Sequence, residues 1–133
     1  MKENKKSPLI KINKKSNKKV FFTWFINLLE MSQSKEKKLT DMQREILIEF
    51  MALPEKYKYD RFSTKARKKV VQIVQEKYNK NYVPTWIGTN ITRIKNKGYI
   101  VLNEDENLDL AISLERILNV KDIEINFKFE INE

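Results

Sequence analysis

The amino-acid sequence predicts an α+β fold in which a core of three helices precedes a β-hairpin. Helix signals with clear beginnings recur over residues 40–97, and a polar five-residue segment then separates two β-rich stretches. The end of the chain alternates strictly between apolar and polar residues. A basic arm and an apolar helix are therefore expected before the core, and a further β-strand is expected after it.

The first two core helices have recognisable starts. "TDMQ" matches a capping box, in which the side chains of Thr40 and Gln43 each accept a hydrogen bond from the other's backbone N–H. Apolar residues follow at helical spacing up to Pro54, so this helix is expected over about residues 41–53. The second helix is expected to begin after Ser63 or Thr64. Its expected buried residues are Ala66, Val70, Val71, Ile73, Val74 and Tyr78.

The third helix is expected over about residues 84–97, within "PTWIGTNITRIKNKGYIVL". Pro84 suits a first helical turn. Ile87, Ile91 and Ile94 recur at helical spacing, so they are expected to face the core. Gly98 suits the position after the helix, where a left-handed backbone is needed.

The rest of the chain is expected to be mainly β-structure. "YIVL" and "NLDLAISL" flank "NEDEN" and predict a β-hairpin with a polar tip, followed by a short helical turn in "ERILNV". The last strand is predicted from "DIEINFKFEIN". One face of that strand would carry Ile123, Ile125, Phe127, Phe129 and Ile131.

The chain before residue 40 divides into two segments. Residues 1–19 hold eight lysines and one acidic residue, which is typical either of an arm that neutralises phosphates or of a solvated tail. Residues 20–31, "VFFTWFINLLEM", predict a helix that is apolar on most sides. This helix would complete the core or form a homodimer contact. The expected organisation is a basic arm (1–19), an apolar helix and linker (20–39), the main domain (40–118) and a strand extension (119–133).

Composition argues against an enzyme. The chain has no cysteine or histidine and only two glycines, which removes thiol and histidine chemistry, zinc sites built on them and a glycine-rich phosphate loop. We therefore expect no catalytic residues, no metal and no cofactor. No apolar run approaches the roughly 18 residues of a membrane-spanning helix, so no membrane partner is expected.

Charge points to an anionic partner. The net charge is +9, and residues 1–98 hold 24 basic and 9 acidic residues. A basic N-terminal part of this kind most often binds nucleic acid. Lysine outnumbers arginine 22 to 5, which is typical of AT-rich coding and is compatible with a virus, a plasmid or a low-GC cell as the source. The expected location is the cytoplasm, or the host cytoplasm or virion if the source is viral.

Residues 40–114, about 75 of the 133, resemble the winged helix-turn-helix family, especially MarR- and PadR-like regulators. The resemblance is carried by "VPTWIGTNITRIKNKGYIVL", a helix with small polar residues that exits through "KNKGYI" into a strand. It implies that residues 84–97 form a recognition helix for the DNA major groove and that the hairpin is the wing. The implied function is a small transcriptional regulator that binds double-stranded DNA, as a possible homodimer through 20–31 and 122–131.

Residues on the helix face opposite the isoleucines carry hydroxyl, amide and guanidinium groups that can bond base edges. The candidates for base readout are Thr85, Thr89, Asn90, Thr92, Arg93 and Asn96. The candidates for phosphate contacts are Lys65, Arg67, Lys68, Lys69, Lys97, Lys14, Lys15, Lys18 and Lys19.

The hairpin tip departs from the family pattern. Glu104, Asp105 and Glu106 would be repelled by phosphates, so the resemblance does not extend to a contact between wing and DNA. A third reading of these acids is a loop that binds a divalent cation. The segment, however, lacks the glycine and the terminal glutamate of an EF-hand. The alternative function is a structural or interaction protein of a larger assembly, for example viral, with residues 20–31, the acidic tip and the last strand as docking surfaces.

Overall fold

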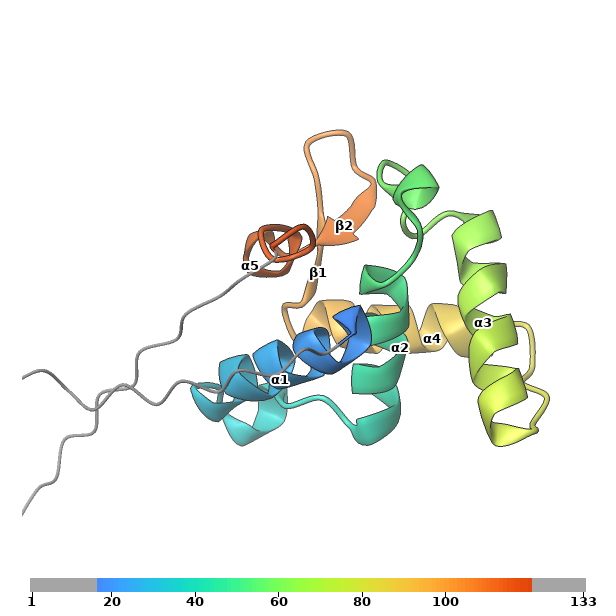
Figure 1. The fold of residues 1–133 in the computed structure, drawn as a ribbon, viewed down its shortest axis with the longest axis horizontal. Coiled ribbons are helices and arrows are strands. Elements are labelled where there is room, and N and C mark those ends of the chain that lie inside the picture. Colours follow the sequence, from blue (N-terminus) through green and yellow to red (C-terminus); the bar gives the residue numbers. More distant parts are fainter. Residues whose placement is uncertain (1–16, 121–133) are drawn as a thin grey trace, which may run out of the picture.

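The computed structural model of the chain describes residues 17–120. Its helices are α1 (Lys18–Met31), α2 (Asp41–Met51), α3 (Thr64–Tyr78), α4 (Trp86–Asn96) and α5 (Ile112–Glu115), and its strands are β1 (Ile100–Leu102) and β2 (Leu108–Leu110) (Figure 1). Two short 3-10 helices, η1 (Lys35–Lys37) and η2 (Glu55–Tyr57), lie in the connections. The α+β class is confirmed, with α2, α3 and α4 followed by the hairpin in the predicted order.

The start of α2 is fixed by the predicted capping box. The Thr40 N–H donates to Gln43 Oε1 at 3.0 Å, and the Gln43 N–H donates to Thr40 Oγ1 at 3.2 Å. Both interactions satisfy donors that a helix start leaves free. The helix ends at Met51, two residues earlier than expected.

Ser63 caps α3, because the Ala66 N–H donates to its Oγ at 3.2 Å. Ala66, Val70 and Val74 are buried as predicted. Tyr78 is not, and its place in the predicted buried set is wrong. It lies on the last turn of α3, where its hydroxyl reaches the surface and donates to the Glu45 carboxylate of α2.

The inner face of α4 is the predicted one. Ile87, Ile91 and Ile94 are all buried. The helix starts two residues later than expected, because Thr85 is the cap. Gly98 follows with a φ of +94°, which confirms the need for glycine at this position.

The hairpin is antiparallel and short, with Ile100 opposite Leu110 and Leu102 opposite Leu108. The expected continuation of the second strand through residue 114 is wrong. The Ala111 N–H donates to the Tyr99 carbonyl at 2.9 Å, and the chain then turns into α5. Leu114 and Ile117 are buried at helical spacing, which favours a helical turn over a strand here.

The apolar helix α1 lies against α2 and shares its core (Figure 1). Phe22 and Ile26 are buried in the same hydrophobic cluster as the inner residues of α2, α3 and α4. The expectation that residues 20–31 complete the core is therefore confirmed. The expected strand at 122–131 and most of the basic arm lie outside the described residues.

Candidate nucleic-acid interface

The outer face of α4 is polar and exposed. Thr89, Thr92, Arg93 and Asn96 are all exposed on this helix, as predicted, while its isoleucines face the core. Thr85, at the cap of α4, is exposed as well. The structure thus brings together five of the six candidates for base readout.

Asn90, the sixth candidate, does not lie on this face. The residue is only 8% exposed, and its Nδ2 donates to the Trp86 carbonyl at 2.9 Å. Asn90 lies three residues after Ile87 and four before Ile94, so it falls at the buried edge of the helix. The expectation that Asn90 lies exposed beside the polar face is therefore wrong.

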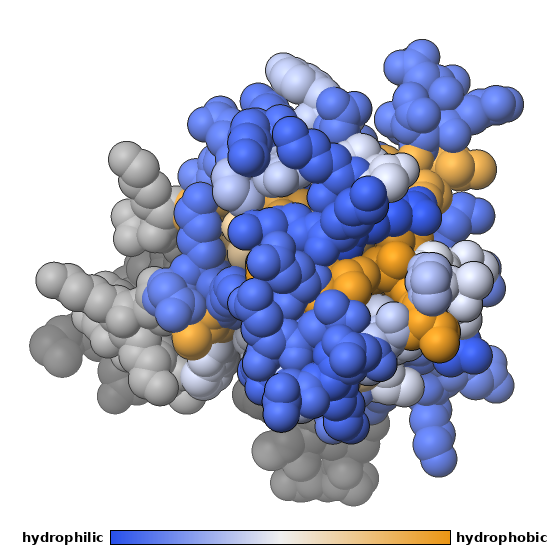
Figure 2. Space-filling view, turned by 90° about the vertical axis from the view of Figure 1, so that its right-hand side faces the viewer, coloured by the Kyte–Doolittle hydropathy of each residue, from blue (hydrophilic) through white to orange (hydrophobic). Residues whose placement is uncertain are grey.

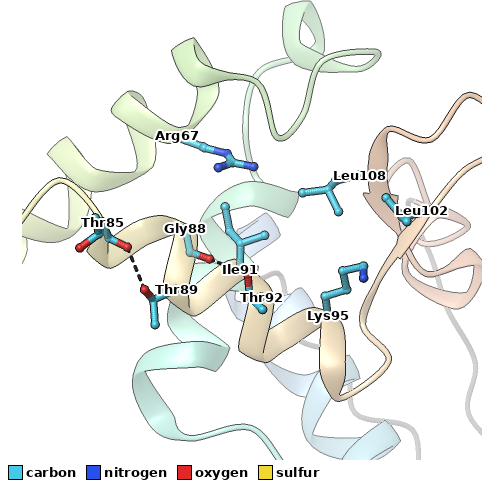
Figure 3. A pocket seen from close by; sticks show the side chains of 9 residues that line it. All are labelled: Arg67, Thr85, Gly88, Thr89, Ile91, Thr92, Lys95, Leu102 and Leu108. Carbon is cyan, nitrogen blue, oxygen red and sulfur yellow. Dashed lines mark hydrogen bonds between the residues drawn. The ribbon is translucent and has the colours of Figure 1, made fainter.

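Two threonine side chains of α4 form hydrogen bonds with backbone carbonyls one turn earlier in the chain. Thr89 Oγ1 donates to the Thr85 carbonyl at 3.0 Å, and Thr92 Oγ1 donates to the Gly88 carbonyl at 3.0 Å (Figure 3). These bonds fix the rotamers of both side chains on the helix surface. The two residues are three positions apart and lie next to each other.

An open groove of about 580 Å³ runs along this part of α4. It is bounded by α3 on one side and by the hairpin on the other (Figure 3). Its lining residues are Arg67, Thr85, Gly88, Thr89, Ile91, Thr92, Lys95, Leu102 and Leu108. Viewed from the α3 side, the molecule shows a band of hydrophobic atoms between hydrophilic ones (Figure 2).

Arg67 forms the α3 wall of this groove. Its Nε donates to the Phe62 carbonyl at 2.8 Å, which positions the guanidinium over α4 (Figure 3). A Cβ atom placed on Gly88 would lie 3.9 Å from Arg67 Nη1, so the guanidinium passes close to the α4 backbone. Arg67 is therefore a preorganised cation beside the polar face of α4.

The charge of the α3–α4 segment is strongly one-sided. Residues 63–98 hold nine basic residues and one acidic residue. Lys65, Lys68 and Lys69 are exposed in the first turns of α3, where cations oppose the helix dipole. A phosphate backbone at this end would offset that unfavourable interaction.

The other lysines predicted to contact phosphates are less available for such contacts than those of α3. Lys97 Nζ donates to the Lys38 carbonyl at 2.7 Å and to Gln43 Oε1 at 2.6 Å, so it is engaged within the protein. Lys19 Nζ lies 2.9 Å from the carboxylate of Glu49. Lys18 is exposed at the start of α1, whereas Lys14 and Lys15 lie outside the described residues.

The sequence did not predict the lining residues Lys95, Leu102 and Leu108, nor that Gly88 and Ile91 border the groove. Lys95 follows Thr92 by three residues, so helical spacing alone could have placed it on this face. Leu102 and Leu108 are opposite each other in the hairpin, but their position beside α4 depends on how the hairpin packs.

The tip of the hairpin is acidic and exposed. Asn103 Oδ1 accepts hydrogen bonds from the backbone N–H groups of Asp105 at 2.9 Å and Asn107 at 3.0 Å. This turn presents Glu104, Asp105 and Glu106 to solvent. The hairpin therefore carries apolar side chains at the groove and negative charge at its end.

Comparison with protein-family models, curated proteins and solved structures found no match to this chain. Residues 17–120 contain no cluster of three or more acidic, histidine or cysteine side chains that could hold a metal ion. None of the helices in that range is both long enough and apolar enough to cross a membrane.

Proposed function

We propose that the protein binds double-stranded DNA and that the outer face of α4 enters the major groove. The observation that carries this proposal is the exposed polar face of α4, lying beside basic residues of α3 in a segment of nine basic residues and one acidic residue. A helix of this diameter fits the major groove of B-DNA. This activity is that of a small transcriptional regulator.

The exposed residues divide into two roles. Arg93 and Asn96 carry groups that bond bidentately to guanine and adenine respectively. Lys65, Lys68 and Lys69 contact phosphates and set the position of the protein on the duplex. The acidic hairpin tip turns away from the phosphates, because like charges repel.

The experiment is a titration of the full chain with random and selected duplexes at several salt concentrations. These three phosphate contacts give a log–log slope of roughly −2.7. Arg93→Ala is expected to weaken binding to selected duplexes by roughly tenfold, since a good base contact contributes about 1–3 kcal/mol. The matched control is Arg116→Ala, an exposed arginine after α5. Equal effects of the two substitutions would contradict base readout by α4.

A second candidate function is protein–protein contact in a larger assembly, as a structural component. The exposed acids at the hairpin tip favour it, because they would not approach DNA. In that case the chain would show no enrichment of any sequence from a random DNA pool. A self-contained dimer in solution that enriches one sequence would argue against the assembly role.

A further inference from the structure

The hydroxyl groups of Thr89 and Thr92 have already used their only hydrogen. Each donates it to the carbonyl four residues earlier, at 3.0 Å. A threonine hydroxyl has one donor and two acceptor lone pairs. Each oxygen can therefore only accept a hydrogen bond from a molecule that approaches the outer face of α4, unless the internal bond is broken.

Both residues are exposed on the outer face of α4, and each carries a γ-methyl group on the same carbon atom as its hydroxyl. The surface that α4 offers at these two positions is thus a hydrogen-bond acceptor beside a methyl group, repeated at adjacent positions. The groove next to it adds the apolar side chains of Ile91, Leu102 and Leu108. This pairing of groups is selective among base pairs.

The base pairs differ in the groups that they present in the major groove to a hydrogen-bond acceptor beside a methyl group. Only adenine and cytosine present an amino donor, whereas guanine N7 and O6 and thymine O4 are acceptors. Only thymine presents a methyl group. An A·T pair therefore supplies the donor and the methyl together, and a G·C pair supplies the donor alone.

We propose that Thr89 and Thr92 are specificity-determining residues that select A·T base pairs in the major groove. Each hydroxyl oxygen accepts a hydrogen bond from adenine N6, and each γ-methyl contacts the C5-methyl of the paired thymine. Arg93, next in sequence to Thr92, reaches a neighbouring base pair. This inference rests on the proposed function, because it names the base pairs that the same face of α4 reads.

The test begins with selection of bound sequences by the full chain from a random DNA pool. The duplex that binds most tightly is then synthesised again with two base substitutions, made one at a time at each A·T pair, and each substitution removes one chemical group. Uracil replaces thymine and removes the methyl, and purine without the 6-amino group replaces adenine and removes the donor. For wild-type protein, the uracil change at a read pair is expected to weaken binding roughly fourfold. Loss of the amino group is expected to weaken it by about two- to tenfold.

Two variants at each position separate the two contacts. Thr92→Val keeps a methyl and removes the acceptor, so it is expected to become insensitive to loss of the amino group. Thr92→Ser keeps the hydroxyl and removes the methyl, so it is expected to become insensitive to uracil. Thr89→Val and Thr89→Ser should behave likewise at a second A·T pair. Thermal melts followed by circular dichroism confirm that each variant is folded.

The matched control is Thr23→Val on α1. Thr23 Oγ1 makes the same internal hydrogen bond, to the Lys19 carbonyl at 2.7 Å, on a helix outside the α4 face. This variant is expected to keep the wild-type response to both base changes.

The outcomes separate this inference from the function on which it rests. A bound duplex whose affinity ignores both base changes, or whose response is the same in wild type and the α4 variants, would overturn A·T selection and leave DNA binding intact. Failure to bind any duplex at low salt would overturn the proposed function itself.

Discussion

Glu30 on α1 and Arg44 on α2 form a two-point ion pair. Arg44 Nε lies 2.8 Å from Glu30 Oε1, and Arg44 Nη2 lies 2.9 Å from Glu30 Oε2. Glu30 is only 6% exposed. The hydrogen bonds that Arg44 donates to Glu30 raise the pKa of Arg44, and Asp41 at 3.0 Å adds to the effect. The pair therefore attaches α1 to α2, which packs against the helices α3 and α4 of the candidate interface.

Arg44→Ala leaves the Glu30 carboxylate buried without its cation. We expect the free energy of unfolding to fall by about 2–3 kcal/mol, measured by denaturant titration. The control is Lys77→Ala, which removes a surface ion pair with Glu45. Such exposed pairs usually contribute less than about 1 kcal/mol. Similar losses in the two variants would show that burial of Glu30 adds nothing.

Tyr99 lies near this ion pair, and its ionisation should lower the stability of the protein at alkaline pH. Among residues 17–120 its buried hydroxyl has no hydrogen-bond partner, and burial raises its pKa above the ordinary value of 10.0. The nearby Glu30 raises this pKa further, and Arg44 opposes the shift. Since the folded state holds the proton more tightly than the unfolded state, stability is complete below about pH 10 and is lost as pH rises through the raised pKa.

Tyr99→Phe is expected to remove this part of the alkaline loss. At pH 7 it should leave the free energy of unfolding unchanged or raise it by up to about 1 kcal/mol, because no hydrogen bond is lost. Unfolding by denaturant between pH 7 and 11 measures the effect. The difference between variant and wild type should grow in favour of the variant above pH 10, and a constant difference would contradict this account.

The elements predicted well are those set by local chemistry. The capping box of Thr40 and Gln43 and the glycine after α4 depend on residues within four positions of each other. The early end of β2 could not be predicted in this way. It depends on Leu114 and Ile117 turning into a core built from residues far away in the sequence.

The candidate site shows the same division. A period of 3.6 residues was sufficient to place Thr89, Thr92 and Arg93 on the outer face of α4. The same period could not show that Lys97 forms a hydrogen bond within the protein, because its partner Lys38 is 59 residues away in the sequence. The groove walls at Arg67 and Leu108 likewise require the packed structure.

The only two glycines, Gly88 and Gly98, should respond oppositely to replacement by alanine. Gly88 lies inside α4 with room for a Cβ, so Gly88→Ala is expected to raise the free energy of unfolding by about 0.5–1 kcal/mol. Gly98 has a φ of +94°, so Gly98→Ala is expected to lower it by about 1–2 kcal/mol through backbone strain. Thermal and denaturant unfolding measure both. Destabilisation by Gly88→Ala would mean that the approach of Arg67 to α4 needs glycine.

The last prediction concerns whether α1 belongs to the folding unit or is an appendage to it. Ile26 is fully buried in the cluster that also holds the inner residues of α2, so Ile26→Ala creates a cavity in the shared core. We expect a loss of about 2–4 kcal/mol in a single cooperative transition. Met31, on the same helix, is 72% exposed, and Met31→Ala should change stability by less than about 0.5 kcal/mol. A separate early transition in the Ile26→Ala variant, with the main transition unshifted, would show instead that α1 docks on an independently stable domain.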